Sequence, residues 1–138
     1  MPVSRPADLP GGGGGRWPHT ATGFRSATWG DMEVALTTAG PLDCTPVYAG
    51  LAGGVCSCPH YFYVFSGRVR CVYPGTDRED EVAGAGDVCY FPAGHVLVYE
   101  EASEVLEFNP AAALADLMDH IESQAAALSQ AGLDETGG

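Results

Sequence analysis

The sequence has few basic residues, no long apolar run and no cysteine pair at the spacing of a zinc ribbon. Only 6 Lys and Arg stand against 18 Asp and Glu, which gives the 138-residue chain a formal charge of -12 at pH 7. This charge repels phosphate backbones and anionic lipid headgroups, so neither nucleic-acid nor membrane partners are expected. No window approaches the roughly 20 apolar residues of a membrane-spanning helix. The first residues are rich in Pro and Gly where a signal peptide has an apolar segment, so we expect a cytoplasmic protein.

The cysteines are odd in number and lack C-x-x-C spacing. This pattern argues against a disulfide framework and against an ordinary zinc ribbon. Thiols that stay reduced can still bind a metal ion. The five positions are Cys44, Cys56, Cys58, Cys71 and Cys89.

The length suits one domain, and composition divides it into segments. Five consecutive glycines among several prolines predict a flexible tail over residues 1–18. Over residues 19–109, short apolar runs alternate with Gly, Pro and Asp turn signals, which is typical of an all-β barrel or sandwich. The expected strands span residues 28–36, 45–51, 56–65, 68–73, 81–83, 88–91, 96–99 and 105–108.

The last segment changes to a helical period. Asn109 is suited to cap a helix whose first residue is Pro110, a position where the missing N–H does no harm. We therefore expect a C-terminal helix over residues 110–130, packed on the barrel or on a partner subunit, and a frayed end over residues 131–138. The apolar stripe of this helix consists of Leu114, Leu117, Met118, Ile121 and Leu128.

Strand periodicity places a set of potential metal ligands on one wall. Alternate residues of a strand share a face, so Cys56, Cys58 and His60 are expected to point the same way. With His95 from a neighbouring loop, they form a predicted divalent-metal site in which thiol and imidazole ligands favour zinc. A water molecule in the place of Cys58 would leave room for a substrate. The predicted substrate-binding residues are Phe62, Tyr90, Phe91 and Tyr99.

Two stretches, "HYFYVFSGRVRCVY" and "GAGDVCYFPAGHVLVYE", resemble the two halves of the cupin signature. Gly86, Pro92 and Gly94 fit the intervals of the second motif, and Gly67 closes the first. The resemblance covers roughly residues 50–109. It implies a cupin double-stranded β-helix, that is, a jelly-roll barrel, with the C-terminal helix added to it.

The ligand positions of the cupin motifs are only partly filled. In the first motif, His60 occupies the slot of the family's glutamate and Cys56 that of its second histidine, while the first histidine slot falls on Gly54. In the second motif, Leu97 occupies the histidine slot, and His95 precedes it by two residues. The resemblance implies enzymes of several reaction classes as well as storage and sensor proteins, so it does not select a reaction.

Three functions are compatible with these residues. The first is a metal-dependent enzyme acting on a small molecule, and the second is a metal-free barrel that binds or senses a small ligand. The third is an interaction subunit. The cysteines could equally be small core residues, with His60 hydrogen bonded to Tyr90, Tyr99 or a backbone carbonyl.

The opposite face of the strand that carries His60 is also apolar. Tyr61, Tyr63 and Phe65 alternate with the inward residues, and burial between two subunits would cover them, so we expect a homodimer. Core packing within one chain is the alternative. The acidic group at residues 100–107 is expected to be surface charge, although a glutamate near the barrel mouth could act as a general base if burial raised its pKa.

Overall fold

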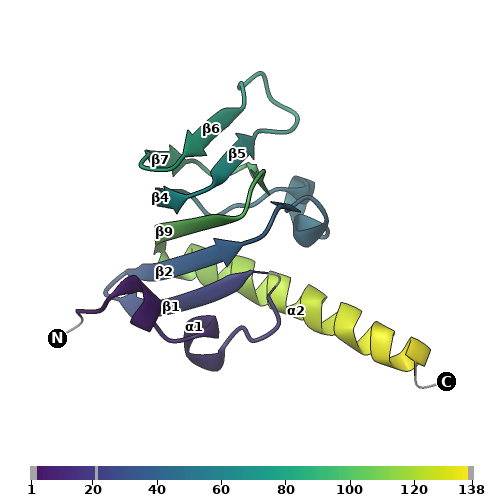
Figure 1. Cartoon of the computed structure of the whole chain (residues 1–138). Coiled ribbons are helices and arrows are strands. Elements are labelled where there is room, and N and C mark those ends of the chain that lie inside the picture. Colours follow the sequence, from purple (N-terminus) through teal and green to yellow (C-terminus); the bar gives the residue numbers. More distant parts are fainter. Residues whose placement is uncertain (1–2, 21, 137–138) are drawn as a thin grey trace.

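The computed structural model describes residues 3–20 and 22–136, with side chains up to residue 127. Two antiparallel sheets form a jelly roll, and a long helix follows them (Figure 1). This confirms the predicted all-β architecture with a C-terminal helix. The five-stranded sheet has the order β1 (Gly23–Trp29), β2 (Met32–Ala39), β9 (Ser103–Pro110), β4 (His60–Ser66) and β7 (Val88–Phe91). The four-stranded sheet has the order β3 (Leu42–Asp43), β8 (Val96–Tyr99), β5 (Arg68–Val72) and β6 (Glu81–Gly84).

The second half of the barrel follows the predicted strands closely, and the first half does not. The expected strand 28–36 is a hairpin, in which β1 and β2 pair from Gly23 with Thr38 to Trp29 with Met32. The expected strand 45–51 is incorrect. Its residues form the short 3-10 helix η2 (Pro46–Tyr48), which begins at a proline that cannot donate a hydrogen bond to a sheet.

From residue 3 onward the N-terminal segment is ordered against the sheet, which corrects the prediction of a flexible tail for residues 3–18; residues 1–2 lie outside the described part. It contains the 3-10 helix η1 (Pro6–Asp8) and the glycine turn α1 (Gly12–Gly15), and it lies along β1 and β2 (Figure 1). Leu9 and Trp17 are each only 2% exposed. The N–H of Ser26 donates to the carbonyl of Pro10, and the Arg16 guanidinium donates to the buried Glu33. Burial of the two apolar side chains thus offsets the ordering entropy of the glycine-rich chain.

Gly67 joins β4 to β5 at a point where only glycine fits. Its φ is +93°, and a Cβ there would lie 2.5 Å from the carbonyl oxygen of Ala102. The Ser103 hydroxyl instead accepts a hydrogen bond from the N–H of Arg68. This tight crossing fixes the start of β5 against β9 and so sets the register of both sheets.

Helix α2 (Ala111–Thr136) packs its apolar stripe on the open end of the barrel. Leu114, Leu117 and Met118 are buried, and Ile121 is partly buried. The helix begins one residue later than expected because β9 continues through Pro110, so Asn109 is a strand residue and not a cap. It extends past the end expected at residue 130; the side chain of Leu128 and residues 137–138 lie outside the described part. No helix among the described residues is long and apolar enough to cross a lipid bilayer.

Candidate functional site

Cys56 and His95 are held together by backbone pairing between two loops. The N–H of Cys56 donates to the carbonyl of His95, and the N–H of Gly94 donates to the carbonyl of Cys56, each at 2.8 Å. Gly94 has a φ of +95°, a conformation that favours glycine, so the P-x-G turn delivers His95 beside Cys56. The turn also fixes the imidazole, because the Pro92 carbonyl accepts a hydrogen bond from His95 Nδ1 at 2.6 Å.

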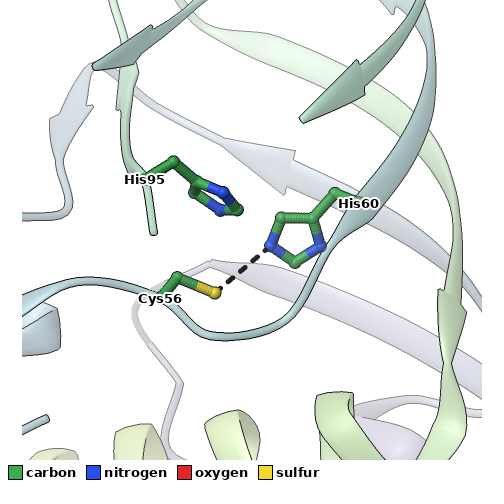
Figure 2. Close-up of side chains that lie close together, drawn as sticks. All are labelled: Cys56, His60 and His95. Carbon is green, nitrogen blue, oxygen red and sulfur yellow. Dashed lines mark hydrogen bonds between the residues drawn. The ribbon is translucent and has the colours of Figure 1, made fainter. Parts of the chain in front are cut away.

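His60 completes a three-residue cluster with them (Figure 2). The ligand atoms of Cys56, His60 and His95 all lie within 4.8 Å of one another, and all three residues are buried. His60 Nε2 lies 3.6 Å from Cys56 Sγ. His95 Nε2 is enclosed and has no hydrogen-bond partner among the described residues, and it is the only buried side-chain nitrogen or oxygen atom there of which this is true. An unpartnered buried nitrogen costs free energy unless something binds it.

The tautomer of His60 is set by a chain of polar side chains on β9. Asn109 Nδ2 donates to Glu107 Oε1 at 3.1 Å, which turns Asn109 Oδ1 toward His60 Nδ1 at 2.7 Å. An amide oxygen can only accept, so the proton of His60 sits on Nδ1. The lone pair on His60 Nε2 therefore faces Cys56, as a metal ligand requires.

Burial decides the protonation of all three ligands. It lowers the pKa of His60 to about 4, against the effect of the hydrogen bond that His60 donates to Asn109. It also lowers the pKa of His95 to about 4, with the neighbouring His60 adding to the shift. It raises the pKa of the Cys56 thiol to about 12, although the N–H of Cys58 donates to the sulfur. At neutral pH the cluster thus holds two neutral imidazoles ready to ligate and one thiol that must lose its proton to do so.

Cys58 lies outside this cluster, which corrects its prediction as a metal ligand. It is buried, but its thiol donates to the carbonyl of Pro59 at 3.3 Å. The prediction assumed that the strand began at Cys56, and β4 begins only at His60. Without regular strand geometry over Ser57–Pro59, alternate residues need not share a face.

An apolar pocket lies between α2 and the barrel, and His60 lines it together with Glu107. The helix contributes four apolar side chains, and the opposite walls come from β1, β2, β8 and the segment that carries η2. The apolar and aromatic lining residues are Phe24, Leu42, Val47, Tyr48, Leu97, Tyr99, Leu114, Leu117, Met118 and Ile121. The Nε2 side of His60 faces Cys56 while its Nδ1 side faces Asn109, so one ring belongs to both the cluster and the pocket.

Of the four predicted substrate-binding residues, only Tyr99 lines this pocket. Phe62 and Phe91 are buried in edge-to-face contact, and Phe62 stacks on His60 with ring centroids 5.3 Å apart, so they support the cluster. Tyr90 is 50% exposed on the outer face, where its ring packs against Tyr61. Side chains alternate along β7, so Tyr90 points to the face opposite to that of Phe91. The prediction of Tyr90 as a substrate-binding residue is therefore incorrect for this pocket.

Glu107 and Asn109 are site residues that the sequence analysis assigned to other roles. Glu107 is 5% exposed, accepts hydrogen bonds from Thr37 and Asn109, and has His60 Nδ1 3.8 Å from its Oε1. Burial raises its pKa. The other buried glutamate, Glu33, is paired with Arg16. The sequence did contain a signal for their burial. Residues 105, 107 and 109 of a strand share one face, and the apolar Val105 marks that face as the inner one.

No protein-family model matches the sequence, and no curated protein matches it. Solved structures do match. The polyketide cyclase RemF from Streptomyces resistomycificus aligns over 80% of this chain and 79% of its own, with 19% identity and a TM-score of 0.50. The Fe(II) form of HppE aligns over 79% of this chain and 60% of its own, with 9% identity and a TM-score of 0.51.

A cupin-2 domain protein from Shewanella frigidimarina aligns over 63% of this chain and 78% of its own, with 16% identity and a TM-score of 0.44. At sequence identities below 20%, structural similarity is evidence for the fold alone and not for the function. The alignments with RemF and HppE, together with the order of the strands in the two sheets, show a jelly-roll fold of the cupin type.

Proposed function

We propose that this protein is a cupin-type metalloprotein that binds a divalent metal ion through Cys56, His60 and His95 and acts on a small molecule. The observation that carries the proposal is the cluster itself: three buried donors within 4.8 Å of one another, one of them the unpartnered Nε2 of His95. A lone buried histidine is usually satisfied within the core. Here an imidazole nitrogen is enclosed beside two other potential ligands and bonded to nothing described.

The donor set favours zinc. One thiolate and two imidazoles suit Zn(II) better than Mg or Mn, which prefer oxygen ligands. Three protein ligands leave a fourth tetrahedral position for water or substrate, the arrangement of catalytic zinc sites. The Fe(II) in HppE makes iron the principal alternative for this fold. A divalent ion in such a site supplies Lewis-acid polarisation of an oxygen atom bound to it.

The chain's own residues would prepare the site for the ion. Asn109 and Glu107 hold His60 in the ligating tautomer, and the Pro92 carbonyl does the same for His95. The N–H of Cys58 donates to Cys56 Sγ at 3.4 Å, which favours the thiolate over the thiol. Phe62 and Phe91 exclude water from the other side. Outer partners of this kind typically change metal affinity by about 10- to 100-fold.

A metal-free ligand-binding barrel is the second candidate, since the pocket beneath α2 is apolar and His60 already contacts Cys56. The two candidates differ in whether the purified protein binds metal. We expect elemental analysis of the protein to find a transition metal, and titration of chelator-treated protein with Zn²⁺ to give one bound ion per chain.

Two single variants and a matched control locate the metal site. Cys56→Ala and His95→Ala should each weaken Zn²⁺ binding by more than the roughly 100-fold expected from an outer-shell change. Cys58→Ala removes a thiol that is equally buried but outside the cluster, and it should leave Zn²⁺ affinity within a few-fold. A wild-type protein that does not bind the tested metal ions, or equal losses in all three variants, would refute the proposed centre.

We also propose that the chain forms a homodimer through an outer aromatic patch. The patch consists of exposed side chains of β4, β7 and β9, namely Tyr61, Tyr63, Phe65, Val88, Tyr90 and Phe108. The N-terminal segment lies over the β1–β2 end of the same sheet, where Val34 and Leu36 are buried, and leaves these residues uncovered. A second copy is the favoured occupant because two chains of charge -12 repel least where they meet through uncharged residues.

A further inference from the structure

The pocket beneath α2 has an apolar roof and polar groups in the rest of its lining. Its roof is the stripe of α2, with Leu114, Leu117, Met118 and Ile121, and its walls include Phe24 and Leu97. The polar groups of its lining come from outside the helix, and they include those of Tyr48, Tyr99, Glu107 and His60. Few polar groups in an apolar cavity are typical of a small-molecule site, where they orient the ligand.

The hydroxyl of Tyr99 is available to a ligand. Tyr99 is only 5% exposed, and its hydroxyl makes no hydrogen bond to any described residue. It is also not among the fully enclosed unpartnered atoms, a set that contains only His95 Nε2 in the described chain. The hydroxyl must therefore keep access to a space that water or a ligand can enter, and the cavity that Tyr99 lines is this pocket.

The lining excludes ligands of either charge beside Glu107. It contains no Lys or Arg, so nothing in it would neutralise a carboxylate or phosphate beside Glu107. Both oxygens of Glu107 already accept hydrogen bonds, Oε2 from Thr37 and Oε1 from Asn109. A neutral polar group incurs neither penalty.

The pocket is also small. The volume open to the centre of a water-sized sphere is about 60 Å³. At roughly 10–15 Å³ for each sphere, it has room for about four to six water-sized groups. The buried part of a ligand is accordingly limited to a handful of non-hydrogen atoms.

We propose that the pocket beneath α2 binds a small neutral molecule with an apolar body and one carbonyl or hydroxyl oxygen, and that this oxygen accepts a hydrogen bond from Tyr99. The apolar body lies under Leu117 and Met118. The inference rests on the proposed function through His60, the residue that the pocket shares with the metal cluster. It adds to that function the chemical class of the ligand and a residue that selects it.

The test is a titration with 2-butanone, followed by the methyl resonances of the methionines. Met118 lines the pocket and Met32 does not, so the resonance of Met118 should shift while that of Met32 stays in place. Propionate and n-butylamine, which are similar in size but charged, should bind at least about tenfold more weakly. Equal affinity for the three compounds, or no shift of Met118 with any of them, would overturn the proposal.

Matched tyrosine variants identify the selecting residue. Tyr99→Phe should weaken 2-butanone binding by about 2- to 12-fold, the range of one net hydrogen bond. Tyr61→Phe removes a hydroxyl from the outer face and should change nothing. A Tyr99→Phe protein that binds 2-butanone as well as the wild type would exclude the hydrogen bond.

The titration is repeated with chelator-treated and with Zn²⁺-loaded protein, which separates this inference from the proposed function. A shift of Met118 in a protein that binds no metal ion would leave the inference intact and refute the metal centre. Metal binding without any shift of the Met118 resonance would refute the inference and leave the proposed metal centre intact.

Discussion

The inner and outer faces of β4 and β9 both depart at several positions from the alternation usual for half-buried strands. Such strands place apolar side chains inside and polar ones outside. Here the inner face carries His60, Glu107 and Asn109, all buried, while the outer face carries Tyr61 and Phe108, both more than 40% exposed. Buried polar groups lose hydration and exposed aromatics promote association, so neither face is explained by the stability of a single chain. The difference is consistent with the proposed metal centre on the inner face and the proposed dimer contact on the outer face.

Neighbouring aromatic residues on β4 give the largest contrast between the faces. Phe62→Ala should lower the free energy of unfolding by about 3–5 kcal/mol, because it leaves a cavity beside His60 and Phe91. Tyr63→Ala should lower it by about 1 kcal/mol or less, because this side chain is 38% exposed and loses only surface contacts. Urea unfolding of the two variants measures both values. Similar losses would show that the outer face is as closely packed as the inner one.

Acid should destabilise the inner face through its histidines. The pKa of His60 and of His95 is about 4 in the folded state, against 6.5 for an imidazole exposed to water. As the pH falls below 6.5, the histidines of the unfolded chain therefore bind protons before those of the folded chain. Their stability contribution is complete above pH 6.5 and is lost between pH 6.5 and 4. At pH 5.5 the protonation of each imidazole in the unfolded chain should already have lowered the free energy of unfolding by about 1 kcal/mol. Glu107 opposes the trend, because its raised pKa favours folding once the carboxyl is protonated.

Urea unfolding of chelator-treated protein at pH 7.5 and 5.5 measures this loss. His95→Gln should reduce the difference in the free energy of unfolding between the two pH values by about 1 kcal/mol, since the amide does not titrate. His19→Gln, a change at an exposed position, is the control. A difference unchanged in His95→Gln would place the acid sensitivity elsewhere.

Substitution in the outer patch should have the smallest effect on the folded chain and act on association instead. Tyr61→Lys should change the free energy of unfolding of the monomer by about 0.5 kcal/mol or less, as surface changes usually do. It should nevertheless convert a dimer to a monomer, because an unpaired charge would be buried at the interface. Light scattering after gel filtration measures the mass. A wild-type protein with the mass of a single chain would refute the proposal that the outer patch is a dimer interface.

The sequence predicts the second half of the fold well because its turn signals lie close together. Glycine and proline stand on both sides of β7 and before β8, and the predicted bounds, Val88–Phe91 and Val96–Tyr99, are those of the structure. The prediction of a flexible N-terminal tail was wrong because amino-acid composition indicates only the average burial of a segment. Two buried side chains, Leu9 and Trp17, are enough to hold a glycine-rich segment in place.

Within the site, three of the four expected ligands come together, and the reasons are local. His60 belongs to a regular strand, and the turn at Gly94 places His95. Cys58 precedes the start of β4, and outside a regular strand successive side chains need not alternate between two faces. Asn109 satisfied the rules for a helix cap, and only the continuation of β9 through Pro110 assigns its side chain to His60 instead. Long-range pairing of this kind leaves no trace in a short sequence window.

Helix α2 follows every strand in the chain, yet its contacts reach back to the N-terminal segment. Trp17 Nε1 donates to Asp119, and the N–H of His19 donates to Glu122. During synthesis the strands therefore leave the ribosome before the roof of the pocket exists. Until the helix arrives, the apolar lining beside Leu97 and Phe24 lacks the cover that Leu117 and Met118 give it in the folded chain. Closure of the pocket is thus a late event in the biogenesis of this protein.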